Sequence, residues 1–292
     1  MHPKLLGILA CLACLGCLLV VANATADQPI APAVDAVPVL TFGVVPQQAT
    51  SLLVQRWVPL LNAVGQAAGV RIEFRTAPDI PAFEARLAEG QYDLAYMNPY
   101  HYTVYHAAPG YQAFARERGP GIRGILVVRK DAPITDIAAL AGQPVAFPAP
   151  AAFAASILPQ AALRQAGITV QPHYVRSHES VYLAVAKGLY PAGGGIERTF
   201  ENTAPETREQ LRVLWRTQPF TPHAFAAHPR VDPRLINRIR AAMTALADAP
   251  PGQALLAAIE FKGIDSAVDA DWDDVRALGI DILAFPASDA PP

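Results

Sequence analysis

The amino-acid sequence predicts an α/β fold with mostly parallel sheets. Two observations lead to this fold class: strand-like runs alternate with helical patterns, and 292 residues suffice for one large domain or two lobes. The apolar run at residues 39–45 predicts the first strand, and residues 46–50 predict a turn. A helix is expected at residues 51–68, where apolar side chains recur at helical spacing.

The same alternation continues towards the C-terminus. Further strands are expected at residues 70–74, 92–97, 122–129, 144–147, 171–175 and 211–215, and further helices at residues 81–89, 134–140, 151–165, 180–186, 233–247, 252–259 and 272–278. In open α/β sheets, ligands bind beyond the carboxyl ends of the strands. The turns that directly follow strands are therefore the expected places for functional residues.

The N-terminus predicts a secretory signal peptide over residues 1–26. Lys4 supplies a positive charge, residues 5–21 form a long uncharged apolar run, and cleavage fits after Ala24 or Ala26. An uncleaved membrane anchor is the alternative, because the run nearly reaches the ~20 residues that a spanning helix needs. Residues 27–38, rich in proline and alanine, predict an extended tether.

Composition excludes several classes of protein. All three cysteines, Cys11, Cys14 and Cys17, lie in the predicted signal peptide, so the exported chain would have no disulfide and no cysteine metal ligand. Without Lys4 the chain carries 22 basic and 25 acidic residues, a net charge of −3. No basic face is evident, which argues against nucleic acid as a partner.

Four turns after predicted strands gather polar or flexible residues. Residues 96–102 pack four rings and an amide into seven positions. Residues 147–156 and 177–180 each open a predicted helix, and residues 192–199 combine three glycines with an adjacent glutamate and arginine. Three consecutive glycines after a strand would allow close approach of the backbone to a ligand.

Motifs of common enzyme classes are missing. The sequence contains no G-x-S-x-G, no P-loop, no G-x-G-x-x-G and no H-E-x-x-H. We therefore expect a binding protein without catalytic residues, cofactor or metal. One alternative is a metal site at which His101, His178, His223 and Glu197 converge, and another is a periplasmic enzyme on the same fold.

Several short segments, in this order, resemble the phosphate/phosphite/phosphonate-binding proteins of ABC importers. The resemblance spans about residues 39–259 and is carried by residues 42–46, 92–96, 122–131, 140–142, 156–159 and 177–185. It implies a type II periplasmic-binding fold, in which two α/β lobes are joined by two crossing segments and close on the ligand.

The resemblance also implies roles for single residues. The histidine that faces the bound oxyanion in this family matches His178, and a carboxylate that reads a ligand amine matches Glu197. A second acidic contact falls near His223, where this chain has a histidine instead. The residues expected to contact the ligand are Gln47, Tyr96, Asn98, Tyr100, His101, Ser156, His178, Ser180, Gly194, Glu197 and His223.

One departure from the family concerns the helix start at residues 152–154. Phosphonate binders of this family place a Ser-Thr-Ser run there, whereas this chain has Ala-Phe-Ala, with Ser156 just beyond. A helix N-terminus still presents backbone N–H groups and a positive dipole end to an anion. The expected ligand is therefore a small oxyanion or a polar organic molecule, with its identity open.

These features predict a two-lobed protein. We expect lobe 1 at residues 39–122 plus 217–284, lobe 2 at residues 123–216, and a flexible tail at residues 285–292. The expected function is periplasmic capture of a small anionic ligand for the membrane permease of an ABC importer. The alternative is a periplasmic sensor that presents its ligand to a membrane signalling receptor such as a histidine kinase.

Overall fold

The computed structural model describes residues 37–281 and residue 283 of the chain. Its first sheet has six strands in the order β11-β4-β10-β3-β1-β2. These strands are β1 (Val39–Val44), β2 (Arg71–Arg75), β3 (Leu94–Met97), β4 (Gln112–Glu117), β10 (Ala224–Ala227) and β11 (Ile264–Ser266). We call this sheet and the helices packed on it the first lobe.

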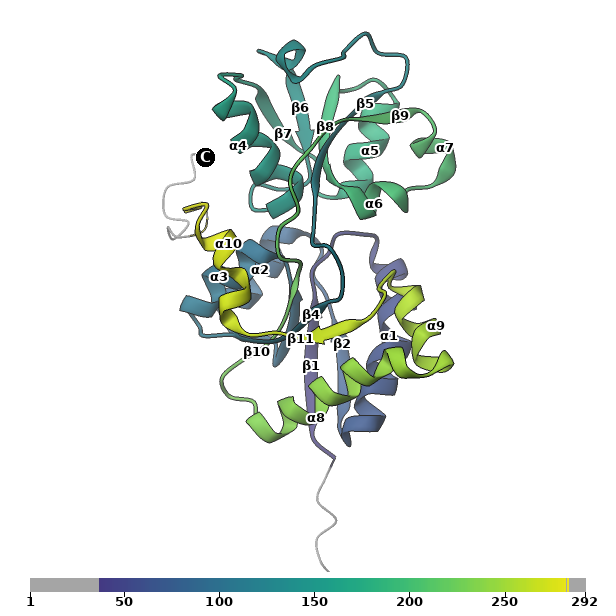
Figure 1. Ribbon diagram of the computed structural model, residues 1–292, viewed down its shortest axis with the longest axis vertical. Coiled ribbons are helices and arrows are strands. Elements are labelled where there is room, and N and C mark those ends of the chain that lie inside the picture. The colour runs from purple at the N-terminus through teal and green to yellow at the C-terminus, as the bar shows by residue number, and fades with distance from the viewer. Residues whose placement is uncertain (1–36, 282, 284–292) are drawn as a thin grey trace, which may run out of the picture. The chain divides into compact units, whose positions relative to one another are not determined.

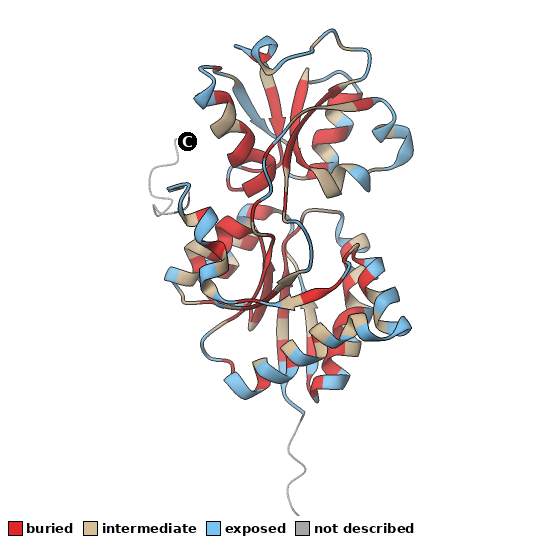
Figure 2. Ribbon diagram, in the orientation of Figure 1, coloured by how far each residue is buried: buried red, intermediate tan, exposed pale blue. Residues whose placement is uncertain are grey.

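Helices cover both faces of the first sheet (Figure 1). On one side lie α1 (Thr50–Ala68), α8 (Pro233–Thr244) and α9 (Pro250–Ala258), and on the other lie α2 (Ile80–Ala88), α3 (Pro99–Ala107), η4 (Asp269–Trp272) and α10 (Asp273–Arg276). The buried residues concentrate on the strands and on the inner faces of these helices (Figure 2). Burial of such apolar faces is the main stabilising contribution to the lobe.

The second sheet has five strands in the order β7-β6-β8-β5-β9. They are β5 (Gly124–Arg129), β6 (Pro144–Phe147), β7 (Gln171–Tyr174), β8 (Ala192–Ile196) and β9 (Leu211–Arg216), and the helical elements around them are η1 (Ile137–Leu140), η2 (Phe153–Ile157), α4 (Leu158–Gln165), α5 (His178–Ala186), α6 (Glu197–Glu201) and α7 (Pro205–Arg208). We call this sheet and its helices the second lobe.

Successive side chains of β5 pack in apolar clusters on opposite faces of the second sheet, so helices cover both faces. Ile125 and Val127 pack in one apolar cluster with residues of α5. Leu126 and Val128 pack in a second cluster, which includes Leu163 of α4. Because successive side chains of a strand point to opposite faces, a continuous apolar run on β5 requires a helix on each side.

The chain crosses between the lobes twice, at residues 118–123 and 217–223. The two crossing segments are paired: the Ile122 amide donates to the Phe220 carbonyl (2.7 Å), and the Phe220 amide donates to the Ile122 carbonyl (2.9 Å). This antiparallel bridge holds the segments side by side.

The expectation of mostly parallel sheets is wrong. Five of the nine pairings between the described strands are antiparallel. The paired crossing segments account for two of them, β4 with β10 and β5 with β9. In each lobe, one crossing segment enters and the other leaves, so the neighbouring strands attached to them run in opposite directions.

Several predicted elements differ from the observed ones. The expected helix at residues 134–140 is only the 3₁₀ turn η1, and the helix expected at residues 151–165 begins as the π-helical turn η2. Helix α3 and strands β4 and β10 were not predicted.

The glycine run 193–195 is part of strand β8 and not a turn. A Cβ atom on Gly194 would lie 2.0 Å from the Ala155 carbonyl oxygen, and one on Gly195 would lie 2.2 Å from the Tyr182 hydroxyl. Glycine is therefore required because η2 and α5 pack directly on the backbone of this strand.

The predicted signal peptide, most of the tether and the C-terminal tail lie outside the described residues. Within residues 37–281, no helix has both the length and the apolar character that crossing a membrane requires.

Candidate ligand-binding site

A small pocket lies between the two lobes at the start of η2. The first lobe contributes Gln47, from the turn between β1 and α1, and Asn98, from the end of β3. The second lobe contributes His178, and His223 stands at the end of the second crossing segment. The remaining lining residues are apolar: Val45, Ile80, Ala152, Phe153, Ala154, Ala155 and Ile196. We call this the central pocket.

His178 is held at the first position of α5. The Ser177 hydroxyl caps this helix by accepting a hydrogen bond from the Ser180 amide (3.1 Å). The His178 side chain is buried, and its Nδ1 lies 3.2 Å from the Thr199 hydroxyl. Burial, and then the positive charge of Arg198, lowers the pKa of His178 to about 4. The ring is therefore neutral at neutral pH.

His223 is fully buried, and its ring stacks on Tyr96 with 4.9 Å between centroids. Its Nε2 lies 2.9 Å from the Gln47 amide nitrogen. Burial, followed by the positive charge of Arg198, lowers the pKa of His223 well below its usual value. Within the described part of the chain, its Nδ1 has no hydrogen-bond partner.

The start of η2 offers further donors to the central pocket. The first backbone hydrogen bond of this turn runs from the Ser156 amide to the Ala152 carbonyl (2.7 Å). The amides of Phe153, Ala154 and Ala155 precede it and have no backbone acceptor among residues 37–281. The Ser156 hydroxyl is buried without a partner in this part of the chain but does not line the central pocket. Backbone groups thus stand where the sequence lacks hydroxyl side chains.

The aromatic turn at residues 96–102 contributes less to the pocket than its composition suggests. Asn98 caps α3 by accepting from the His101 amide (2.8 Å) and donates to the Ala151 carbonyl of the other lobe (3.1 Å). His101 is buried, and its Nε2 lies 2.9 Å from a Glu84 carboxylate oxygen. The Tyr100 hydroxyl accepts from the Leu283 amide (2.8 Å), so Tyr100 binds the C-terminal segment instead of lining the pocket.

The other expected contacts that do not line the central pocket are Tyr96, Ser156, Ser180, Gly194 and Glu197. The Ser180 hydroxyl lies 2.8 Å from the Ser177 hydroxyl as part of the helix cap. Gly194 is covered by η2. Glu197 accepts from Arg216 (2.6 Å) and lines a neighbouring pocket.

Arg198 is the residue whose role the sequence analysis missed. Arg198 lies on α6 in the second lobe. Its side chain forms an ion pair with Glu117 and donates to the Tyr96 hydroxyl (3.3 Å), and both of these partners are in the first lobe. Its guanidinium carbon also lies 5.2 Å from the centre of the Phe261 ring. A Glu-Arg pair in sequence normally indicates a solvated surface, and only the fold places Arg198 between the lobes.

The metal-site alternative is not supported by the geometry. No group of three or more histidine, cysteine, aspartate or glutamate side chains in the described residues is arranged to hold a metal ion. Glu197, one of the four residues considered, is paired with Arg216.

Comparison with known proteins identifies the family. Residues 42–272 match the family model described as "ABC transporter, phosphonate, periplasmic substrate-binding protein". The chain belongs to this family. Among curated relatives, a phosphate-import protein PhnD from Mycolicibacterium smegmatis is 24% identical over 94% of each chain.

Solved structures show the same fold. A binding protein of an ABC phosphonate transporter from Pseudomonas aeruginosa aligns with a TM-score of 0.77 and 18% identity, covering 84% of this chain and 86% of its own. PhnD1 from Prochlorococcus marinus, in complex with methylphosphonate, aligns with a TM-score of 0.76 and 16% identity, covering 82% and 97%. The predicted two-lobed, type II periplasmic-binding fold is thereby confirmed.

Family membership establishes the general function. The protein is a periplasmic solute-binding component of an ABC importer, as expected, and its partners are a small ligand and a membrane permease. Such components are exported and bind substrate for transport. Nothing in these comparisons supports the signalling alternative.

Proposed function

We propose that the protein captures a small phosphorus oxyanion, such as phosphate, phosphite or a simple phosphonate, in the central pocket. The observation that carries the proposal is the set of buried donors around one small volume. These are the backbone amides of Phe153, Ala154 and Ala155 and the neutral rings of His178 and His223. Their arrangement suits a compact anion with several acceptor oxygens.

Neutral donors suit such a ligand for an energetic reason. A buried oxyanion needs a partner for each oxygen, and each missing partner costs ~1–3 kcal/mol. The helix start supplies several N–H groups and its positive dipole end without burying a full charge. The backbone amides of residues 153–155 can therefore replace the missing hydroxyl side chains, provided that both histidines donate as well.

Ligand capture is proposed to couple to closure of the lobes. The two crossing segments would act as the hinge between residues 39–122 plus 217–284 and residues 123–216, and the permease would recognise the closed form. Export would proceed through the predicted signal peptide at residues 1–26. The protein would release its ligand unchanged, because its proposed role is binding and not catalysis.

The test is isothermal titration calorimetry on the protein purified from the periplasm, with phosphate, phosphite, methylphosphonate and sulfate as probes. At least one phosphorus oxyanion is expected to bind. His178→Gln should weaken that binding by about 10- to 100-fold, since one hydrogen bond to a charged group is lost.

His173→Gln is the matched control. His173 is exposed on β7, outside the central pocket. This control should bind like the unsubstituted protein. Equal effects of the two substitutions, or no binding of any phosphorus oxyanion, would contradict the proposed site.

A further inference from the structure

We infer that Gln47 determines which nitrogen of His223 carries the ring proton, so that Nδ1–H donates to the bound oxyanion. This assignment makes Gln47 a positioning residue and His223 a donor that selects acceptor ligands. The inference rests on the proposed function for the identity of the ligand, but the protonation of the ring can be measured without it.

The geometry fixes the ring from two sides. Tyr96 stacks on the His223 ring at an interplanar angle of 18°. The Gln47 amide nitrogen lies 2.9 Å from Nε2. His223 is also fully buried, directly before β10. A ring held by stacking at its face and by a hydrogen bond at one nitrogen has little freedom to turn its other nitrogen elsewhere.

The Gln47 contact decides the tautomer. With the Gln47 amide nitrogen assigned to this contact, an N–H₂ group that only donates faces Nε2, and Nε2 then carries a lone pair. A neutral imidazole has one proton, which then resides on Nδ1. The ring is kept neutral by its burial and by the nearby positive charge of Arg198. His223 therefore presents one N–H donor and no positive charge.

The Nδ1–H group of His223 has no hydrogen-bond acceptor within the described residues. His223 lines the central pocket, and its Nδ1 is buried without a hydrogen-bond partner in residues 37–281. Buried donors are rarely left unmatched, because the loss of hydration is not offset. An oxyanion oxygen in the central pocket would supply the acceptor.

The tautomer also restricts the class of ligand. An Nδ1–H group accepts no hydrogen bond, so it would repel an ammonium group placed against it. Glu197, the carboxylate that the family resemblance matched to a ligand amine, is already paired with Arg216. We therefore expect methylphosphonate, phosphite or phosphate to bind more tightly than 2-aminoethylphosphonate.

The test combines NMR spectroscopy with calorimetry. Long-range ¹H–¹⁵N spectra of the histidine-labelled protein, assigned with His223→Gln, should show a protonated Nδ1 and an unprotonated Nε2. Gln47→Glu should move the proton to Nε2, because the carboxylate only accepts hydrogen bonds. The affinity for methylphosphonate should then fall at least tenfold. Gln47→Met should leave a mixture of both tautomers.

Gln48→Glu is the control, because it adds the same charge one residue away. The Gln48 side chain accepts from Arg56 (3.3 Å), does not line the central pocket and should leave the tautomer unchanged. A proton on Nε2 in the unsubstituted protein, or a tautomer insensitive to Gln47→Glu, would overturn the inference. If NMR places the proton on Nδ1 but calorimetry detects no oxyanion binding, the tautomer assignment is correct. The proposed function, and with it the proposed contact between Nδ1–H and the ligand, is then wrong.

Discussion

At the scale of single residues, the buried histidines link the site to the stability of the protein. His178 has a pKa of about 4 in the folded state against an ordinary value of 6.5. The unfolded chain therefore binds a proton at this residue between those pH values, and the folded protein does not. The free energy of unfolding should keep the full contribution of His178 above pH 6.5 and lose it as the pH falls towards 4.

We predict a loss of about 3 kcal/mol from His178 across this pH range, at ~1.4 kcal/mol for each pH unit. Urea unfolding of the ligand-free protein at pH 7 and pH 4.5 measures the loss. Carboxylates titrate in the same range, so the comparison is with His178→Gln, whose unfolding free energy should fall less steeply. Parallel pH profiles for the two proteins would show that burial does not suppress protonation of this ring.

Gly194 shows how a residue outside the central pocket can shape it. A Cβ at this position would meet the Ala155 carbonyl at 2.0 Å and the Phe147 ring at 2.6 Å. Since a backbone atom cannot move aside like a flexible side chain, Gly194→Ala should displace η2 and destabilise the protein by roughly 3 kcal/mol.

A contrasting substitution is Gly142→Ala, where a Cβ would meet no atom within 4 Å but the backbone has φ +70°. It should cost only about 1 kcal/mol, from the left-handed conformation. Thermal and urea unfolding of both variants test the comparison. A smaller effect for Gly194→Ala than for Gly142→Ala would contradict the proposed close packing.

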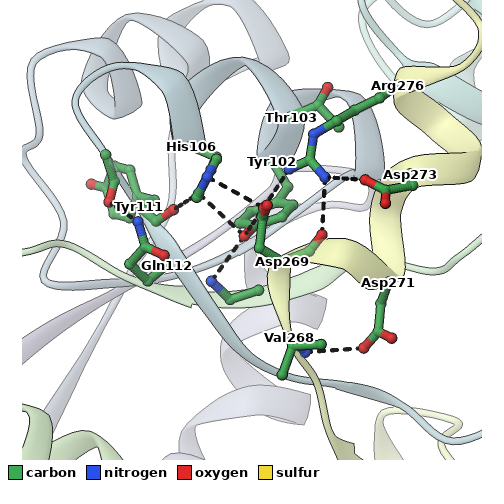
Figure 3. A network of polar contacts seen from close by, with 12 residues as sticks. Tyr102, Thr103, His106, Tyr111, Gln112, Val268, Asp269, Asp271, Asp273 and Arg276 are labelled. Carbon is green, nitrogen blue, oxygen red and sulfur yellow. Dashed lines mark hydrogen bonds and ion pairs between the residues drawn. The ribbon is translucent and has the colours of Figure 1, made fainter.

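At the scale of elements, the C-terminal segment braces the helix that follows β3. The Asp269 carboxylate accepts from the Tyr102 hydroxyl of α3 (2.7 Å), lies 3.4 Å from His106 Nε2 and forms an ion pair with Arg276 (Figure 3). The same segment reaches the second crossing segment, because the Trp272 indole donates to the Pro222 carbonyl (2.9 Å). One short stretch of chain thus fixes both α3 and the residue before His223.

Asp269→Ala should therefore destabilise the protein by about 1–2 kcal/mol, because the buried Tyr102 hydroxyl loses its acceptor. Asp273→Ala removes a carboxylate that is 69% exposed and pairs with Arg276, so it should cost less than ~0.5 kcal/mol. Urea unfolding of both variants measures the two losses of unfolding free energy. Equal losses would show that the Asp269 contacts contribute no more than a surface ion pair.

The elements also show how far sequence patterns reach. Strands such as β1 and β6 were predicted closely because apolar runs bounded by turn residues are local signals. The short strand β10, Ala-Phe-Ala-Ala, carries little β propensity and exists because β3 and β4 pair with it on both sides. Strand β8 was read as a turn because its glycines are required by packing partners distant in sequence.

The same limits of local sequence patterns apply to the prediction of the candidate site. His178 and Gln47 follow predicted strands, where the general rule for α/β sheets expects ligand contacts, and both line the central pocket. Tyr100, Ser180 and Glu197 follow strands as well, yet each is directed elsewhere by a partner that the sequence does not reveal. The N–H donors of the helix start were expected from the predicted helix, but the π-helical turn that leaves the amides of residues 153–155 unbonded was not.

At the scale of the whole molecule, side chains of the two lobes contact each other directly. Arg198 and Asn202, both following β8 in the second lobe, form polar contacts with Glu117 and Glu260 of the first lobe. Glu260 in turn pairs with Arg56 (2.8 Å). These contacts favour the closed arrangement of the two lobes and lower the free-energy cost of closing around a ligand.

Arg198→Met should shift the ligand-free protein towards open forms, because it removes the charge that three groups of the first lobe contact. If the closed fraction falls tenfold, the apparent dissociation constant rises about tenfold, since only that fraction binds. Small-angle X-ray scattering should show a larger radius of gyration without ligand and a normal one at saturation. Arg216→Met, which breaks a pair within the second lobe only, should change neither quantity. An unchanged radius of gyration for Arg198→Met would mean that the lobes close by other contacts.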